Sequence, residues 1–211
     1  RTASIAAATG GTVFNFAYSG YDVVMDDCPA LVSAAVAMAQ EVLSFNSLRS
    51  REGLPTVSFR MALDVGDVLL GVVGDNTQMQ PTAISTSFSA VRGLISLCSK
   101  LQANILCTEA VISGAGEYAY RYMGKCLQDD LPVRVYEIFS GDEYEVRRAK
   151  QATVRRFSQG VLALYSGETL QAKRIFLELA HQNSRDGGVR HYLYLADRLE
   201  KDPGRPCSLD G

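Results

Sequence analysis

The chain has 211 residues, which is long enough to bury a full hydrophobic core and predicts one domain of about 150 residues with a smaller appendage. Its formal net charge of −2 provides no overall positive field, so the composition argues against a nucleic-acid partner. Five widely spaced cysteines and two histidines, without a Cys-x-x-Cys pair, argue against a zinc site and a disulfide framework, and they fit a reducing cytoplasm.

The sequence contains no run of 18 apolar residues, so we expect no membrane span. Its first residues, RTASIAAATG, do not look like a signal peptide. Because the chain begins with Arg1 rather than Met, we expect it to be part of a longer protein. The expected location is the cytoplasm, which includes the cytosolic part of a membrane-attached protein.

Strand pairs alternate with helices in the first part of the chain. Residues 1–9 predict the end of a helix, because two glycines suited to a helix C-terminus follow it. Residues 12–17 and 21–25 predict two strands joined by a turn. A helix is expected from Pro29 to about Leu48, since proline is favoured in a first turn and apolar residues then recur at helical spacing.

Residues 61–75, MALDVGDVLLGVVGD, form the most informative stretch. We expect strands over residues 57–63 and 68–74 that fold back on each other at Gly66 and Asp67. The second strand is a nearly continuous apolar run, which predicts burial on both faces. A polar loop over residues 75–81 is expected next. The helix after it should bury Phe88, Val91, Leu94, Ile95 and Cys98.

Residues 103–107 predict a short buried strand, and residues 118–123 and 133–139 predict a final strand pair. This order of antiparallel strand pairs and helices favours an α+β fold with the helices on one face of a sheet. The expected organisation is a first domain over residues 1–140, a helical extension over residues 141–205 and a frayed tail over residues 206–211.

The helical extension has small and aromatic residues at spacings similar to those of one tetratricopeptide unit: Gly160, Gly167, Ala172 and Phe176. An ordinary C-terminal helical hairpin is the alternative. Basic residues near its start predict a solvated helix face: Arg147, Arg148, Lys150, Arg155 and Arg156.

The stretch at residues 61–75 resembles the central hairpin of the class III nucleotidyl cyclase domain of adenylyl and guanylyl cyclases. That family writes it as Ile-Gly-Ile-His-x-Gly-x-Val-x-x-Gly-x-x-Gly. Gly66, Gly71 and Gly74 fall in register, while Asp64 replaces the His. The resemblance covers about residues 3–140 and implies a ferredoxin-like antiparallel sheet with helices packed on it. The first strand of the family, which precedes its first helices, is absent from this chain.

The resemblance also implies a nucleoside triphosphate site between two protomers, in which two carboxylates hold two Mg²⁺ or Mn²⁺ ions. One carboxylate belongs to the absent strand, and the other position falls on Ser19, a weak and neutral ligand. Base recognition falls on Asn15, where the family has Lys, and on Thr82, where its residue is kept.

The remaining implied positions bind the ribose and the phosphates. The ribose-orienting Asn falls on Ser89 and the phosphate-binding Arg on Gly93, with Arg92 one residue away. A second phosphate-binding residue, Lys in the family, falls on Leu127, two residues from Lys125. Most of the charged site residues are therefore replaced, while the glycines of the fold are kept.

These replacements predict a degenerate, inactive cyclase-like domain, without assigned catalytic residues or metal ligands, that acts as a dimerisation or regulatory module. Its expected partner is a second copy or another cyclase-like domain, and the helical extension could bind a further protein. The residues expected at the dimer seam are Leu70, Val72, Ile84 and Phe88.

Two alternatives stay open. One is an active cyclase that makes cyclic AMP or cyclic GMP with displaced residues and Mg²⁺ or Mn²⁺, namely Asp22, Asp64, Arg92 and Lys125. The other is a domain that binds a nucleotide without turnover, as a sensor.

Overall fold

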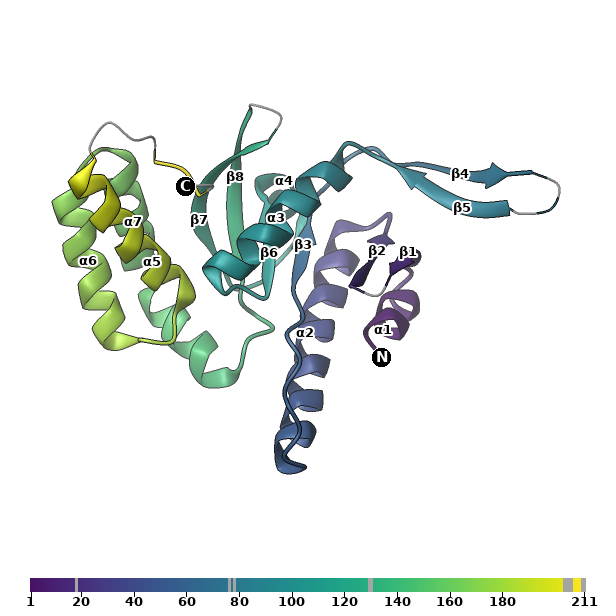
Figure 1. Ribbon diagram of the computed structural model, residues 1–211, viewed down its shortest axis with the longest axis horizontal. Helices are drawn as coiled ribbons and strands as arrows, with labels where there is room; N and C mark the ends of the chain where they lie inside the picture. Colours follow the sequence, from purple (N-terminus) through teal and green to yellow (C-terminus); the bar gives the residue numbers. More distant parts are fainter. Residues whose placement is uncertain (18, 76, 78, 129–130, 203–206, 210–211) are drawn as a thin grey trace.

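The computed structural model describes residues 1–211 except 18, 76, 78, 129–130, 203–206 and 210–211 (Figure 1). Its helices and strands confirm the α+β fold class. In chain order they are α1 (Thr2–Ala8), β1 (Thr12–Ala17), β2 (Gly20–Val24), α2 (Cys28–Arg51), β3 (Met61–Leu63), β4 (Leu69–Gly74), β5 (Met79–Ile84), α3 (Ser87–Leu101), β6 (Ile105–Thr108), α4 (Glu109–Gly114), β7 (Tyr120–Gln128), β8 (Leu131–Ile138), α5 (Tyr144–Tyr165), α6 (Thr169–Gln182) and α7 (Gly187–Lys201).

The described strands form three sheets. One contains β1 and β2, the central one has the order β3-β6-β8-β7, and the third contains β4 and β5. In the central sheet β3 runs parallel to β6, whereas the other two pairs are antiparallel. The sheet is therefore mixed rather than wholly antiparallel, because the long connection through β4, β5 and α3 returns the chain in the direction of β3.

Hydrophobic clusters lie on both faces of the central sheet. On one face, Met38 of α2 packs in a cluster with Ile105. On the other, Leu101 of α3 and the C-terminal helices pack with Leu106. Since Ile105 and Leu106 are neighbours on one strand, they point to opposite faces. The helices therefore cover both faces, and the expectation of one covered face is wrong.

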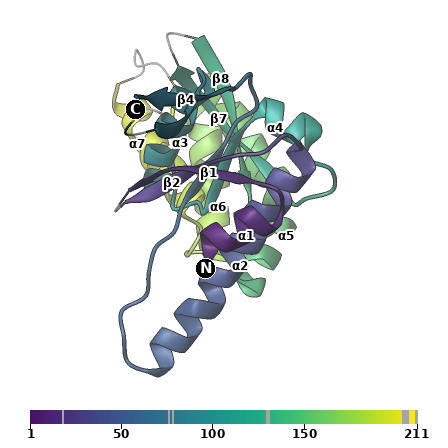
Figure 2. The same cartoon turned by 90° about the vertical axis from the view of Figure 1, so that its right-hand side faces the viewer.

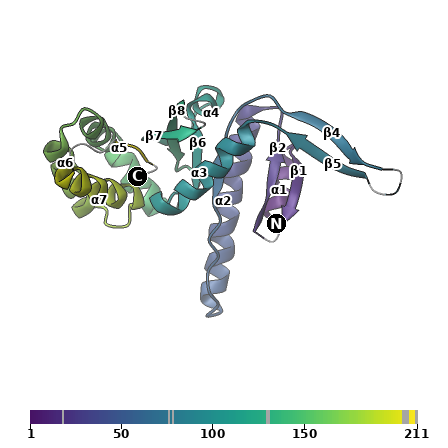
Figure 3. The same ribbon diagram turned by 45° about the horizontal axis from the view of Figure 1, so that its top comes forward.

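The predicted hairpin over residues 61–75 is replaced by a different pairing. β3 joins the central sheet, and β4 pairs with β5 in register from Leu69 opposite Ile84 to Gly74 opposite Met79. The expected polar loop over residues 75–81 thus contains the start of β5. We call β4 and β5 the arm, because they extend away from the rest of the chain (Figures 1 and 3). Every residue of β4 is exposed, which contradicts the prediction of a strand buried on both faces.

The buried stripe of α3 lies slightly round the helix from the predicted one. It consists of Ala90, Leu94, Leu97, Cys98 and Leu101. Ile95, which we expected to be buried, is 39% exposed. The difference arises because the C-terminal helices provide Leu97 and Leu101 with a second apolar surface.

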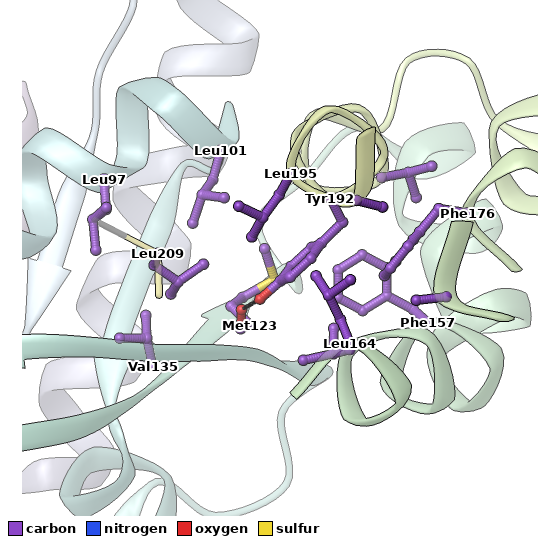
Figure 4. Packing of buried hydrophobic residues seen from close by; sticks show 14 of the residues in the cluster. Leu97, Leu101, Met123, Val135, Phe157, Leu164, Phe176, Tyr192, Leu195 and Leu209 are labelled. Carbon is purple, nitrogen blue, oxygen red and sulfur yellow. Dashed lines mark hydrogen bonds between the residues drawn. The ribbon is translucent and has the colours of Figure 1, made fainter. Parts of the chain in front are cut away.

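The C-terminal helices share a core with the central sheet (Figure 4). α5 and α6 form the expected hairpin, and α7 packs beside them. The ring of Phe176 stacks on that of Tyr192 with centroids 5.0 Å apart, and Phe157 meets Phe176 edge-on at 5.7 Å. The Tyr192 hydroxyl donates a hydrogen bond to the carbonyl of Met123 on β7. The helical extension therefore packs on the first domain; its similarity to a tetratricopeptide unit stays a prediction.

A buried network of five charged residues joins the extension to the sheet. Arg121 of β7 donates to Glu137 of β8 at 2.6 Å and to both carboxylate oxygens of Asp186 before α7 at 2.6 and 2.7 Å. Lys150 of α5 donates to Glu137 and to Asp142, each at 2.6 Å. Lys150 is only 4% exposed, so its expected place on a solvated face is wrong.

The tail differs from the frayed segment expected over residues 206–211. Leu209 is fully buried, and its backbone N–H donates to the carbonyl of Lys125 at 3.0 Å. Pro206, Asp210 and Gly211 lie outside the described residues. The tail therefore packs on β7 at least at Leu209.

Helix α2 is long and apolar enough, by length and composition, to cross a membrane, a test that core helices also pass. Its first half packs in the core through residues such as Ala35 and Met38, while its last turns extend beyond the sheet (Figures 1 and 2). Asn46 ties the returning chain to these turns, since its side chain bonds to both the N–H and the carbonyl of Val57. The expected lack of a membrane span stays a prediction.

Candidate functional site

A cleft of about 970 Å³ brings together five of the polar residues considered in the sequence for nucleotide or metal binding. It is lined by residues 20–26 along β2, by residues 58–68 around β3, by α2 and by the start of α3. The five residues are Asn15, Ser19, Asp22, Asp64 and Arg92. Its volume is of the size that small-molecule sites have, roughly 300–1,000 Å³.

On one wall, Asn15 holds Asp22. The Asn15 backbone is left-handed, with φ of 50°, a conformation that asparagine adopts more readily than most residues. The pairing of β1 with β2 shifts register between Phe14 and Ala17, around this residue. The Asn15 side-chain amide donates to the Asp22 carboxylate at 2.7 Å. Asn15 and Asp22 are therefore hydrogen-bonded to each other within the lining of the cleft, which also includes Ser19.

On the other wall, Asp64 is held by Thr108. The hydroxyl of Thr108 donates to the Asp64 carboxylate at 2.6 Å. Thr108 was not predicted from the sequence as a partner of Asp64. Its position becomes predictable once the parallel pairing of β3 with β6 is known. Leu63 lies opposite Cys107, so the next residues of the two strands, Asp64 and Thr108, are neighbours.

Lys125 faces a different cavity. Together with Asp64, Thr108, Glu109 and Arg134 it lines a second space of about 660 Å³, in which Arg134 pairs with Glu109 at 2.6 Å. Of the four displaced residues considered for an active site, Asp22, Asp64 and Arg92 therefore share the cleft, and Lys125 does not.

Four implied site positions lie away from the cleft. Thr82 is on the arm, opposite Gly71, rather than in a loop. Ser89 and Gly93 are exposed on α3, and Leu127 is 60% exposed on β7. Of the implied base, ribose and phosphate positions, one chain therefore gathers Asn15 with Ser19 but not Thr82, Ser89, Gly93 or Leu127. Their roles stay predictions, because the implied site lies between two protomers.

The residues of the cleft do not fit a divalent metal ion. Within the described ranges of the chain, no three His, Cys, Asp or Glu side chains lie close enough together to hold one. Asp22 and Asp64 stand on opposite walls, and each already accepts a hydrogen bond. Since Mg²⁺ needs closely spaced oxygen ligands, this donor set does not support two-metal chemistry within a single chain.

Comparison with known proteins places the fold. No family model matches the chain. It is 27% identical over 122 residues to an adenylate cyclase of Anabaena cylindrica, covering 53% of this chain and 24% of that protein. It is 24% identical over 137 residues to a terminal-differentiation specific adenylate cyclase of Dictyostelium discoideum, covering 62% of this chain and 6% of that protein. The chain thus spans a quarter or less of the length of these curated relatives.

Solved structures share the fold at low sequence identity. A bacterial light-regulated adenylyl cyclase superposes with a TM-score of 0.58 at 16% identity, covering 72% of this chain and 47% of that one. The adenylyl cyclase CyaB from P. aeruginosa gives 0.52 at 23%, covering 65% and 76%. The dimeric guanylyl cyclase domain of the RhoGC fusion protein from Blastocladiella emersonii gives 0.51 at 15%, also covering 65% and 76%. The sequence relatives and the solved structures together point to a class III adenylyl/guanylyl cyclase domain.

Proposed function

We propose that the chain is a degenerate cyclase-like domain that pairs with a second copy of itself or with another cyclase-like domain, and that it acts as a dimerisation or regulatory module rather than as an enzyme. The observation that carries this proposal is the exposed arm. Its strands, LLGVVG and MQPTAI, contain no charged residue, yet all of β4 and, on β5, Met79, Pro81 and Ile84 are exposed.

Both faces of the arm present aliphatic side chains. Leu69 and Ile84 are paired on one face, and Leu70 and Val72 lie on the other. Leu69 is 69% exposed and Val72 is 65% exposed. Burying one such side chain stabilises a protein by about 1.5–3 kcal/mol, and a two-stranded hairpin alone is marginally stable. These features support a partner that covers the arm.

The proposed lack of activity rests on the cleft. Ser19 stands where the resemblance requires a metal-binding carboxylate, and a hydroxyl cannot balance a divalent charge as a carboxylate does. Of the four aspartates that line the cleft, Asp22 accepts a hydrogen bond from Asn15 and Asp64 accepts one from Thr108. Arg92 is exposed at the start of α3, and no acidic side chain in the described part of the chain forms an ion pair with it.

Light scattering tests the pairing. We expect dimers of the purified chain at micromolar concentration, and we expect Val72→Asp to weaken association by about tenfold or more, because it places a charge on a buried apolar contact. The control is Leu162→Asp, the same kind of change at an exposed leucine of α5 that is 58% exposed. A strictly monomeric chain, or equal effects of both variants, would contradict the proposed pairing.

An assay with ATP and with GTP in Mn²⁺ tests the lack of activity, with an active cyclase as the positive control. We expect no cyclic nucleotide. A thermal-shift titration with the same nucleotides separates a scaffold from a nucleotide sensor, since a ligand that binds the folded state raises its melting temperature. We expect no shift at millimolar nucleotide; formation of product would overturn the proposal of inactivity.

A further inference from the structure

One face of α5 is exposed along the whole length of the helix. The opposite face packs on the sheet and on the other C-terminal helices through residues such as Phe157, Val161 and Leu164. Because an α-helix turns by about 100° per residue, Arg148 and Arg155 lie on the side away from these residues, and both are exposed. We call the exposed row at positions 144, 148, 152, 155, 159 and 162 the α5 stripe.

The α5 stripe combines two positive charges with an apolar side chain at each end, and it contains no acidic residue. Its members are Tyr144, Arg148, Ala152, Arg155, Gln159 and Leu162. Tyr144 is 61% exposed and Leu162 is 58% exposed. The small Ala152 side chain between the two arginines lets a second helix approach closely at the middle of the stripe.

The two arginines of the stripe keep their charges available to a partner. Among the described residues, no acidic side chain forms an ion pair with Arg148 or Arg155. The next residue, Arg156, lies off the stripe and is paired with Glu178 of α6 at 2.6 Å. The positive charge of the stripe therefore complements an acidic partner.

The spacing of the two arginines fits a helical partner. Seven residues span about 10.5 Å along a helix axis, and a second α-helix lying along α5 has the same rise per residue. Acidic side chains seven positions apart on that helix would face both guanidinium groups. In the helices that the structure describes, no two acidic residues are seven positions apart. A second copy of these helices therefore does not supply the partner.

We propose that the α5 stripe binds one acidic amphipathic helix of another protein. The helix has about 20 residues, which span the distance from Tyr144 to Leu162, and it carries two Asp or Glu residues seven positions apart. Apolar side chains flank these acids and pack on the two ends of the stripe. Ion pairs between exposed groups are individually weak and are screened by salt, so the complex is transient and salt-sensitive. The proposal does not depend on pairing through the arm.

The test begins with selection from a phage-displayed library. The library uses one helical scaffold of about 20 residues with the positions of one face randomised. The bait is the 211-residue chain, and the same chain with Arg148→Gln and Arg155→Gln is used to remove helices that bind elsewhere. We expect enriched helices to share two acidic residues seven positions apart.

Affinities of one enriched helix then locate its binding site. The helix is labelled with a fluorophore, and its anisotropy is measured against increasing protein. We expect Arg148→Gln with Arg155→Gln to weaken binding by about tenfold or more. The matched control is Arg174→Gln with Arg185→Gln, which removes the same charge at exposed positions outside α5 and should keep binding. Melting curves check that each variant is folded.

Two further variants separate this proposal from other roles of the same residues. Arg148→Glu with Arg155→Glu should lose the acidic helix and bind a twin peptide in which Lys replaces the two acids. A purely structural role of the arginines would not exchange the preferred peptide. Val72→Asp on the arm should leave peptide binding unchanged, so a failure of the pairing through the arm does not affect the result.

Four results would overturn the proposal. They are failure of any helix to enrich, enriched helices that lack the two acids, equal binding by the Gln variant and the original chain, and failure of charge reversal to exchange the peptides. Sedimentation with vesicles of phosphatidylcholine and phosphatidylglycerol tests an anionic membrane instead. If the vesicles bind the chain but not its Gln variant, and no helix is enriched, the stripe belongs to a lipid surface and the proposal is wrong.

Discussion

Single residues decide how firmly the helical extension is held, and Arg121 is central among them. Its guanidinium lies 4.2 Å from the centre of the Phe157 ring and bonds to both Glu137 and Asp186. Burial by itself would raise the pKa of Glu137, but Arg121 and Lys150 lower it below its ordinary value. These buried charges therefore depend on one another.

Removing Arg121 should leave two carboxylates without their main partner. We expect Arg121→Met to lower the free energy of unfolding by about 3–5 kcal/mol, the usual cost of breaking a buried ion pair from one side. Urea denaturation measures it. The control is Arg156→Ala, which breaks an exposed pair with Glu178 and should cost less than about 1 kcal/mol. If Arg121→Met lowers the free energy of unfolding no more than Arg156→Ala does, the buried network does not stabilise the fold.

Acid should loosen the network at Asp186. Burial opposes its charge, but the hydrogen bonds and the positive charge of Arg121 hold the pKa of Asp186 below its ordinary value. A lowered pKa in the folded state stabilises the fold above the unfolded pKa, and this stabilisation is lost as pH falls through the folded pKa. Asp186→Asn, which can still accept the bonds from Gly188 and Val189, should therefore be less stable at pH 7 and lose less stability below pH about 4. The free energy of unfolding of both proteins is measured from pH 7 to pH 3. If it changes with pH by the same amount in both, Asp186 is not the group whose protonation loosens the network.

The sequence contains little information on such contacts. Lys150 reads as one more charge on a basic helix, and its burial depends on Glu137 and Asp142, which come from other segments. Asp64 likewise meets Thr108 only because β3 and β6 are parallel. Partners distant in sequence are set by topology, which residue patterns within one segment do not report.

Among the elements, the crossing of α5 and α6 depends on Gly160. A Cβ atom at this position would lie 2.8 Å from the ring of Phe176, which is itself stacked on Tyr192. The small residue noticed in the sequence therefore lies where two helices meet most closely.

Two glycine substitutions test this crossing. Alanine stabilises a helix by about 1 kcal/mol relative to glycine, so Gly93→Ala on α3, where nothing lies within 4 Å of the added atom, should raise the free energy of unfolding. Gly160→Ala should instead lower it by about 1–3 kcal/mol, the cost of overpacking. Chemical denaturation of both variants provides the comparison. Stabilisation by Gly160→Ala would mean that the helices can separate without cost.

Elements with a clear period and end signals were predictable. α2 begins at Cys28, beside the expected Pro29, and β6, β7 and β8 overlap the expected strands to within a few residues at their ends. β5 was not predictable, because Pro81 and Thr82 are typical of loops and the strand shows no apolar alternation. The apolar run of β4 indicates a segment that avoids water, but such a pattern does not say which polypeptide covers it.

At the scale of the whole molecule, the extension completes one face of the central sheet. Leu97, Leu101 and Val135 belong to the same cluster as Phe157 and Phe176 (Figure 4). The predicted boundary at residue 140 therefore separates two kinds of secondary structure that share a core. The fold class was predictable from the order of elements. The position of the extension was not, because its apolar face could pack equally well on the central sheet or on another protein.

Truncation should reveal this dependence. A chain of residues 1–143 would expose a large apolar area, and we expect it to bind a hydrophobic dye and to lose the near-ultraviolet circular dichroism of packed aromatic rings. The control replaces residues 69–84, the arm, with a Gly-Gly-Ser linker and should keep a cooperative thermal transition. A truncated chain that unfolds cooperatively would show that the first domain is independent.

The docking of Leu209 has a practical consequence for spectroscopy. Its N–H donates to the Lys125 carbonyl, so Leu209 is held directly against β7. A fluorophore on Ser208, next to Leu209, would therefore report on β7, a strand in the middle of the sequence.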